Sequence, residues 1–228
     1  MTDFDPNIVA VARVAAALGP LMDELVLVGG CAVGLLITDH AISPIRATVD
    51  VDLVTEVASL AGYNELGDRL KQVGFAEYGD PTCRWVSGPM LIDVVPTQDT
   101  PLSPTNPWYA SAARNALDVT LASGQPIRLI AAPYFLATKL VAFRDRGKGD
   151  YMHHDMEDII TIVNGRPEVV AEVNASEPDV KAFLQEEFED LILDSRFVEQ
   201  LEWFFDPDEA SQARVPTVLG RLRQLSGS

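Results

Sequence analysis

Three aspartates in the first half of the chain have the spacing of a cation site. Asp50 and Asp52 alternate with aliphatic residues in the segment 49–54, and Asp93 lies in the similar apolar segment 91–95. Side chains at positions i and i+2 of a strand point to one face, so Asp50 and Asp52 are expected to converge on one point. Hard cations such as Mg²⁺ take carboxylate oxygens together with substrate phosphates. The pattern predicts a magnesium site formed by Asp50 and Asp52, with Asp93 as the third ligand.

A glycine pair precedes these aspartates. Gly29-Gly30 follows the apolar run 25–28 and leads into a short helical pattern at 31–37. Glycine lets the backbone approach a phosphate closely, and a helix N-terminus offers unpaired N–H donors. Two cations beside such a loop can activate an attacking hydroxyl and stabilise a leaving pyrophosphate. The simpler alternatives are an ordinary turn at the glycines and a solvated strand face at Asp50 and Asp52. The aliphatic neighbours argue against a solvated face, because they indicate a buried strand.

Two polar side chains flank the aspartate segment and are candidate nucleotide ligands. Arg46 and Thr48 lie two to four residues before Asp50. Arg46 contacts phosphate in one interpretation. In the other, it neutralises the clustered acids, which would otherwise repel each other.

A pair of cations in the second half has helical spacing. On a helix of ~100° per residue, Lys139, Ala142 and Arg146 fall on one stripe, with a small residue between two positive charges. Such a stripe is suited to a triphosphate, and the alternative for Lys139 is an ordinary surface lysine. Arg144 points away from this stripe and is interpreted as a solvent-exposed or structural residue.

The run His153-His154-Asp155 has two further interpretations. A metal-dependent phosphohydrolase site would need additional distant histidines, and only His40 remains. Asp155 also suits the N-cap of a helix at 156–163. Asp158, one turn later, is expected to pair with Lys139 or Arg146.

The elements that position these residues form two halves. Apolar, β-branched and alternating runs predict strands up to about residue 130, whereas helical periodicity dominates beyond Pro133. We therefore expect an α+β fold: a mixed β-sheet with flanking helices at 1–130, then a helical part at 131–228. The predicted strands and hairpins are 25–28, 49–54, 76–78 with 83–86, 90–95, and 117–121 with 127–130.

The composition limits the partners. The formal net charge of −17 argues against a broad phosphate-binding face, although the segment 139–148 is locally basic. Cys31 and Cys83 have no metal-site or disulfide-framework spacing and are predicted to be buried. No apolar run reaches the ~20 residues of a membrane span, which favours a cytoplasmic protein with no membrane partner.

The motifs resemble those of a known family. The segments 28–32 (VGGCA) and 46–53 (RATVDVDL) resemble the first motif of polymerase-β-like nucleotidyltransferases. They are most similar to the abortive-infection (AbiEii-like) toxin branch. Lys139, Ala142 and Arg146 match that branch's second motif, Lys-x-x-Ala-x-x-x-Arg, and residues 155–158 match its Asp-x-x-Asp motif. The chain departs from the family at Cys31 and in a longer gap before Asp50, which contains Ser43-Pro44-Ile45.

The resemblance implies an activity and roles for these residues. It implies transfer of a nucleoside monophosphate from a triphosphate to an acceptor hydroxyl, with Mg²⁺ or Mn²⁺ as cofactor and the site in the cleft between the two halves. Asp50, Asp52, Lys139 and Asp155 would be catalytic. Gly29, Gly30, Arg46, Thr48, Lys139 and Arg146 would bind the nucleotide, and Asp50, Asp52 and Asp93 the metal.

Two classes of acceptor, and a protein without catalytic activity, are compatible with the sequence. The family implies a toxin of a toxin–antitoxin pair, acting on transfer RNA or protein, with an antitoxin as partner. A small cationic acceptor of the aminoglycoside type is the rival, since an acidic chain would attract it. The third alternative is a catalytically silent nucleotide-binding or interaction protein. The position of Asp93 discriminates, because its convergence with Asp50 and Asp52 would complete the metal site.

Overall fold

A computed structural model describes residues 5–39, 41–42, 46–57, 59–79, 83–98 and 106–227 of the chain. Two compact units are present: residues 1–35 with 44–131 (unit 1), and residues 36–43 with 132–228 (unit 2). Several predicted features lie outside the described residues: His40, the inserted Ser43-Pro44-Ile45 and part of the turn expected at 79–81.

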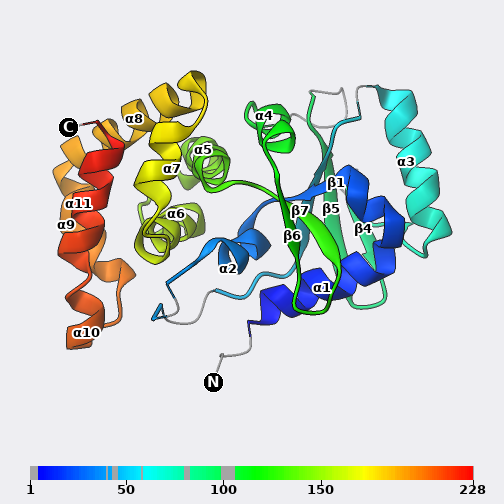
Figure 1. Cartoon of the computed structure of the whole chain (residues 1–228), viewed down its shortest axis with the longest axis horizontal. Coiled ribbons are helices and arrows are strands. Elements are labelled where there is room, and N and C mark those ends of the chain that lie inside the picture. Colours follow the sequence, from blue (N-terminus) through cyan, green and yellow to red (C-terminus); the bar gives the residue numbers. More distant parts are fainter. Residues whose placement is uncertain are drawn as a thin grey trace. The chain divides into compact units, whose positions relative to one another are not determined.

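Unit 1 is built on a mixed seven-stranded sheet with the order β3-β4-β5-β2-β1-β7-β6 (Figure 1). The pairs β2–β5 and β1–β7 are parallel, and the other neighbours are antiparallel. This sheet, followed by a helical unit, confirms the predicted fold class. The strands are β1 (Leu25–Leu27), β2 (Val51–Thr55), β3 (Ala76–Glu77), β4 (Arg84–Ser87), β5 (Met90–Pro96), β6 (Leu117–Thr120) and β7 (Pro126–Leu129).

Strand β2 alternates as predicted but begins later. Val51 and Leu53 are buried, whereas Asp52 between them is half-buried on the other face. The ladder with the neighbouring strands begins at Val51, so Asp50 lies just before the strand. Val49, expected on the buried face, is instead 86% exposed. The ladder that imposes the two-residue alternation of a strand begins only after residues 49 and 50.

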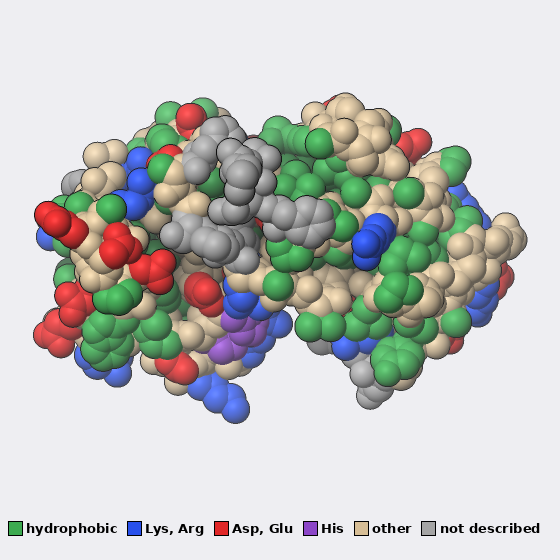
Figure 2. All heavy atoms as spheres, turned by 90° about the horizontal axis from the view of Figure 1, so that it is seen from below, with side chains coloured by type: hydrophobic (Ala, Val, Ile, Leu, Met, Phe, Trp, Pro, Cys, Tyr) green, Lys and Arg blue, Asp and Glu red, His purple; other side chains and the backbone are tan. Residues whose placement is uncertain are grey.

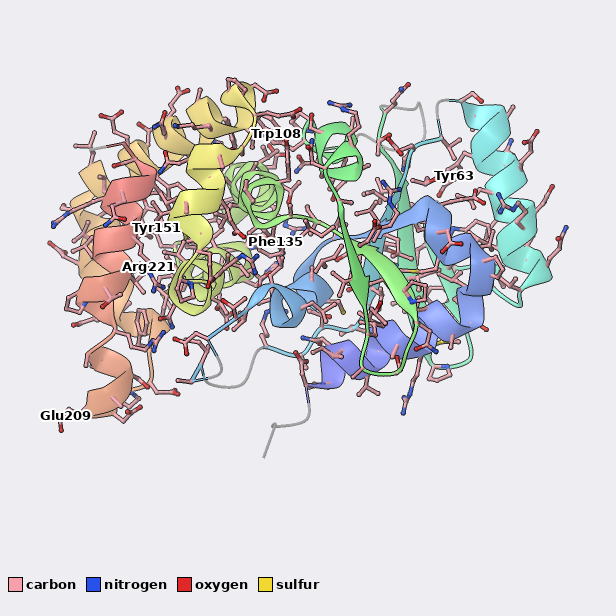
Figure 3. The ribbon with its side chains drawn as sticks, in the orientation of Figure 1. Tyr63, Trp108, Phe135, Tyr151, Glu209 and Arg221 are labelled. Atoms are coloured by element: carbon pink, nitrogen blue, oxygen red, sulfur yellow. The ribbon has the colours of Figure 1, made fainter. Side chains whose placement is uncertain are left out.

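The two long helices of unit 1 begin at polar caps. α1 (Pro6–Leu18) starts with proline, and the Asp5 side chain accepts a hydrogen bond from the Asn7 N–H. α3 (Leu60–Gln72) begins after Ser59, whose side chain accepts a hydrogen bond from the Gly62 N–H. The Tyr63 hydroxyl donates to the carbonyl of Val94 at 2.8 Å and ties α3 to β5 (Figure 3). The remaining helical segments are η1 (Gly19–Glu24), η2 (Gly30–Ala32), α2 (Val33–Leu36) and α4 (Tyr109–Arg114).

Unit 2 is helical and is organised around α5 (Ala132–Ala142). This helix contacts α6, α7 and α8, and its residues from Ala132 to Leu140 are all buried. α5 is thus apolar around most of its circumference, as expected for a central helix. The other segments are the π-helical turn η3 (Phe143–Gly147), α6 (His154–Gly165), α7 (Val169–Ala175), α8 (Pro178–Leu193), α9 (Ser195–Gln200), η4 (Leu201–Phe204), α10 (Glu209–Gln212) and α11 (Val215–Leu225).

Polar contacts fasten the last helix of unit 2. The Arg221 guanidinium, labelled in Figure 3, donates to the carbonyls of Val163 and Asn164 at the end of α6. These carbonyls belong to the last turn of a helix, where backbone acceptors lack helical partners. Within the described part of the chain, no helix is both long enough and apolar enough to cross a membrane.

Candidate active site

Two of the predicted aspartates face the same side of the sheet in unit 1. Asp52 on β2 is the register partner of Asp93 on the parallel strand β5. Asp93 is in turn the register partner of Arg84 on the antiparallel strand β4. Directly opposite residues of paired strands project to one face, so these three form a cross-strand row. Asp93 thus lies beside Asp52 on one face of the sheet, whereas the ligand atoms of Asp50, Asp52 and Asp93 are not a group within 4.8 Å of one another among the described residues.

Arg84, which the sequence patterns do not single out, joins the carboxylates. Its Nε donates to Oδ1 of Asp93 at 2.8 Å, and its Nη2 donates to Oδ2 of Asp93 at 2.7 Å. The same Nη2 also donates to Oδ2 of Asp50 at 2.8 Å. Asp93 therefore points neither into the core nor to solvent: it converges with Asp50 on a guanidinium.

The sequence does carry a local signal for this ion pair. Strands at 83–86 and 90–95 are separated by Gly88-Pro89, which is turn chemistry. A tight hairpin there pairs Ser87 with Met90, and counting outward along both strands pairs Arg84 with Asp93. The predicted hairpin joins the segments 76–78 and 83–86 only, and it therefore does not include this second pairing.

The ion pair is tight and only partly solvated. The side chain of Arg84 is 28% exposed and that of Asp93 is 13% exposed. Hydrogen bonds from the guanidinium to Asp93 raise the pKa of Arg84, with the charge of Asp50 adding to the effect. Bidentate arginine–carboxylate pairs are among the stronger hydrogen-bonded contacts in proteins. Arg84 is therefore permanently charged, and its hydrogen bonds to Asp93 and Asp50 hold it in place.

The glycine pair makes room for side chains of the aspartate segment. Gly29 has a φ of +64°, and a Cβ at this position would lie 1.9 Å from Oδ2 of Asp52. A Cβ on Gly30 would lie 2.5 Å from Cγ2 of Thr48, with Nη2 of Arg46 also near at 3.5 Å. The predicted reason for these glycines is the approach of a phosphate. The structure adds a second reason: the carboxylate of Asp52 packs directly on the backbone of Gly29.

Replacing Gly29 with alanine should destabilise unit 1 more than backbone strain alone predicts. The positive φ costs about 1–2 kcal/mol for an L-residue, and the Cβ must also displace the carboxylate of Asp52. Gly79 is a matched control, because it has a φ of +66° and open space where a Cβ would lie. In urea denaturation, Gly29→Ala should lose at least about 1 kcal/mol more than Gly79→Ala. Equal losses would mean that Asp52 does not need the space at Gly29.

A buried asparagine holds the loop that leads to the aspartates. Asn7 on α1 is 1% exposed, and its amide nitrogen donates to the carbonyl of Arg46 at 3.0 Å. Its Oδ1 accepts from the N–H of Thr48 at 2.9 Å. These two hydrogen bonds pair one side chain with the backbone on both sides of residue 47. The sequence does not predict this role for Asn7, because nothing near it indicates an interaction with residues 46–48.

Cys31 contributes to the same loop. Its thiol lies 2.9 Å from the Thr48 hydroxyl and donates to the carbonyl of Asp50 at 3.3 Å. Burial raises the pKa of this thiol to about 11, and the charges of Asp52 and Asp50 add to the effect. The neutral thiol is thus a structural donor. Cys31 and Cys83 are both free and buried, which confirms the prediction for them.

In unit 2, the predicted cations surround one buried carboxylate. Nζ of Lys139 lies 3.2 Å from Oδ1 of Asp155 and 2.6 Å from Oδ2 of Asp158. Arg146 donates to Asp155 twice, from Nε to Oδ2 and from Nη2 to Oδ1, each at 2.7 Å. The expected pairing of Asp158 with Lys139 is therefore present. The side chain of Lys139 is only 8% exposed, so it does not form the accessible stripe that helical spacing indicated.

Two local expectations in this region need correction. Asp155 is not the N-cap of α6: His153 is, and its Nδ1 accepts from the Asp155 N–H at 3.3 Å. The stripe also does not continue as an α-helix to Arg146, because residues 143–147 form a π-helical turn. Arg144 points elsewhere, as expected, and pairs with the buried Glu187.

His153 and His154 lie beside the same carboxylate. The ligand atoms of His153, His154 and Asp155 lie within 4.8 Å of one another, and among the described residues no other group of three metal-ligating side chains is so close. Both oxygens of Asp155 already accept hydrogen bonds from Arg146, and Lys139 is adjacent. Two fixed positive charges oppose a metal cation there. Figure 2 shows the histidines next to basic side chains, an environment that favours an anion.

The carboxylates of unit 1 have the donor chemistry of a hard-cation site. Oxygens of Asp50 and Asp93 both contact one cationic nitrogen, Nη2 of Arg84, which marks a point where positive charge is stabilised. Asp52 lies on the same face. Oxygen ligands of this kind suit Mg²⁺ and Mn²⁺. In donor type, Asp50 and Asp52 therefore suit a divalent cation, whereas both oxygens of Asp93 are engaged by Arg84.

The fold has counterparts among solved structures. An antigenic nucleotidyltransferase-like protein from Paracoccidioides brasiliensis superimposes with a TM-score of 0.51 and 21% sequence identity, over 78% of this chain and 91% of that one. The fold is nucleotidyltransferase-like. The likeness is one of fold, and membership of the polymerase-β-like superfamily and of its AbiEii-like branch stays a prediction.

A second solved structure is similar over most of its length. It is ANT(2")-Ia in complex with adenylyl-2"-tobramycin, with a TM-score of 0.45 and 14% identity, over 80% of this chain and 97% of that one. No protein-family model and no curated protein matches the chain.

Proposed function

We propose that this protein is a metal-dependent nucleotidyltransferase that moves a nucleoside monophosphate from a nucleoside triphosphate to an acceptor hydroxyl. The observation that carries the proposal is the cross-strand row in unit 1. Asp52 and Asp93 share one face of the sheet, Asp50 converges with Asp93 on Arg84, and Asp52 packs on the Gly29 backbone. Acidic side chains beside a Gly-Gly turn that leads into helical backbone are the parts such chemistry needs.

The proposal assigns the carboxylates of unit 1 to metal binding. Asp50 and Asp52 would hold Mg²⁺ or Mn²⁺, and Asp93 would keep Arg84 in place. When bound, the cation supplies charge neutralisation for in-line transfer at the α-phosphorus. The Gly30 backbone, with Arg46 and Thr48 packed over it, would contact the phosphates. Asn7 holds residues 46 and 48 and so orients these contacts.

The cations of unit 2 are proposed, taken by themselves, as a phosphate-binding group. Arg146 is 56% exposed at its side chain, and it lies with His153 and His154 around Asp155. A phosphate oxygen would approach Arg146 first. Lys139 is held by Asp155 and Asp158, so its contribution is to fix the electrostatics behind Arg146. In this scheme Asp155 is a positioning residue.

The acceptor is proposed in two forms. The toxin form, suggested by family resemblance, uses transfer RNA or a protein hydroxyl and implies an antitoxin. The second form uses a small cationic acceptor of the aminoglycoside type. The net charge of −17 favours the second form, because an acidic protein attracts cations and repels nucleic acid.

A labelling experiment tests the activity and identifies the acceptor. Purified protein is incubated with each α-³²P-labelled nucleoside triphosphate and Mg²⁺ or Mn²⁺. Separate reactions contain total transfer RNA, cell-extract protein or an aminoglycoside. We expect label on one acceptor class, equimolar pyrophosphate and complete loss of transfer with EDTA.

The other outcomes of this experiment distinguish the proposed function from its alternatives. Binding of a nucleoside triphosphate with no labelled product in any reaction would indicate a silent nucleotide-binding protein and refute the proposal. Label on transfer RNA alone would favour the toxin form. Label on the aminoglycoside alone would favour the small-molecule form.

A further inference from the structure

Arg84 makes more hydrogen bonds to Asp93 than to Asp50. It makes two hydrogen bonds to Asp93, at 2.8 and 2.7 Å, which engage both oxygens of that carboxylate. It makes one hydrogen bond to Asp50, through Oδ2 at 2.8 Å. Asp93 is also less exposed than Asp50, at 13% against 28%. Asp93 is therefore committed to Arg84, whereas Asp50 is shared.

The strand register makes this arrangement persistent. Arg84 and Asp93 are directly opposite on antiparallel strands, so both ends of their ion pair are fixed by the ladder. Asp50 lies before β2, outside the ladder, and its side chain accepts one hydrogen bond from Arg84 against the two that Asp93 accepts. A bound divalent cation would sit close to a guanidinium that cannot lose its proton, and like charges at short range repel.

We infer that Arg84 is a built-in counter-cation that keeps Asp93 out of metal coordination and lowers the site's affinity for a divalent cation by competing for Asp50. The cation is then held through Asp50 and Asp52. Asp93 acts on it only indirectly, by fixing Arg84. The inference rests on the proposed function, from which it takes the divalent cation.

Metal titration of an arginine variant tests the inference. Arg84→Met removes the charge and keeps a side chain of moderate length. Electron paramagnetic resonance measures the free Mn²⁺ that remains during the titration. The variant should bind Mn²⁺ at least about tenfold more tightly than the unaltered protein does. In EDTA the variant should melt at a lower temperature, because the carboxylates then repel each other. Unchanged or weaker Mn²⁺ binding would overturn the inference.

Arg128→Met is the matched control. Arg128 lies on β7 of the same sheet, its side chain is 27% exposed, and it forms a loose ion pair with Glu56 at 3.9 Å. This change removes one positive charge from unit 1 and leaves Asp52, Arg84 and Asp93 unaltered. Its Mn²⁺ affinity should stay within about threefold of the unaltered protein. An equal gain in both variants would mean that general charge, not competition for Asp50, sets the affinity, and would overturn the inference.

Removing Asp93 in two backgrounds isolates its role. With Arg84 present, Asp93→Asn should change Mn²⁺ affinity by no more than about threefold, because Asp93 is not a ligand there. In the Arg84→Met background the same change should weaken binding at least about tenfold, because the released carboxylate has become a ligand. Equal effects in both backgrounds would contradict the inference.

Two further results keep the test decisive. If Arg84→Met does not fold, Arg84→Lys keeps the charge but loses the planar fork, and an intermediate gain in Mn²⁺ affinity is expected. No gain with Arg84→Lys would then overturn the inference. Tighter Mn²⁺ binding without any nucleotide transfer would refute only the proposed function. Nucleotide transfer with unchanged Mn²⁺ affinity in the variants would refute only the inference.

Discussion

Asp50→Asn is expected to reduce nucleotidyl transfer by at least about 100-fold while leaving the protein folded. The amide has nearly the same shape as the carboxylate but cannot bring negative charge to a divalent cation. Of the three aspartates, Asp50 is the one that shares Arg84 through a single hydrogen bond and lies outside the strand ladder. Its carboxylate is thus the one best able to turn toward a metal. Steady-state incorporation of labelled nucleotide, measured at saturating metal, checks this.

The fold should survive this change. Arg84 retains both hydrogen bonds to Asp93, and its ion pair with Asp50 is partly exposed to solvent and therefore weak. Asp68→Asn, on the solvent side of α3, removes the same charge from unit 1 and should leave activity within about twofold. Activity in Asp50→Asn equal to that control would refute the assignment of Asp50 to the metal.

Asp155→Ala is expected to lower the free energy of unfolding by about 3 kcal/mol or more, the second large effect. The side chain of Asp155 is 0% exposed and accepts hydrogen bonds from Arg146 and Lys139. Removing it leaves the buried ammonium of Lys139 with one fewer counter-charge. Arg146, being more exposed, can turn to water and loses less. Urea denaturation of the purified variant measures the decrease.

A surface variant calibrates this result. Glu189→Gln, at an exposed position of α8, also removes one negative charge from unit 2 and should change stability by no more than about 0.5 kcal/mol. A decrease in Asp155→Ala no larger than in this control would mean that the ion network around Asp155 contributes nothing to the fold.

The pH dependence of stability reports on the same carboxylate. Burial alone would raise the pKa of Asp155, but the hydrogen bond from Arg146 and the charge of Lys139 outweigh it and lower the pKa from 3.8 to about 2. Because the folded-state pKa is depressed, this contribution is complete above about pH 4 and disappears as the pH falls toward 2. The shift corresponds to about 2 kcal/mol. Asp155→Asn should lack this part of the acid-induced destabilisation, and identical acid profiles for both proteins would contradict the assignment.

Local patterns in the sequence predict much of unit 1. The alternation of Val51, Asp52 and Leu53 places one acidic side chain and two aliphatic ones on opposite faces of a strand, as the structure has them. That pattern needs only the two-residue repeat of a strand and the cost of burying charge. The strand–Gly-Gly–helix order is likewise evident without a partner. The bounds of the strand are harder to predict, since the ladder that ends it belongs to its neighbours.

The partners of the charged residues are decided by tertiary structure. Arg84 meets Asp50 across 34 positions of sequence, and Asn7 meets Thr48 across 41. The periodicity of one segment does not predict such a contact. The contact depends on which strands pair and in what register. Lys139 gives the same lesson in unit 2. Helical spacing correctly groups it with Arg146, but its burial follows from the packing of α5 among α6, α7 and α8.

The three aspartates and the glycine pair are thus determined by the sequence as a candidate phosphate-and-metal group, because residue type and short-range spacing specify such chemistry. Whether Asp93 is available to a metal is decided only by the tertiary structure. Its oxygens are engaged by Arg84 because two strands of a hairpin place one guanidinium opposite one carboxylate. The same guanidinium also reaches Asp50, 34 positions away, and that contact depends on which strands pair and in what register, so the residues alone do not reveal it.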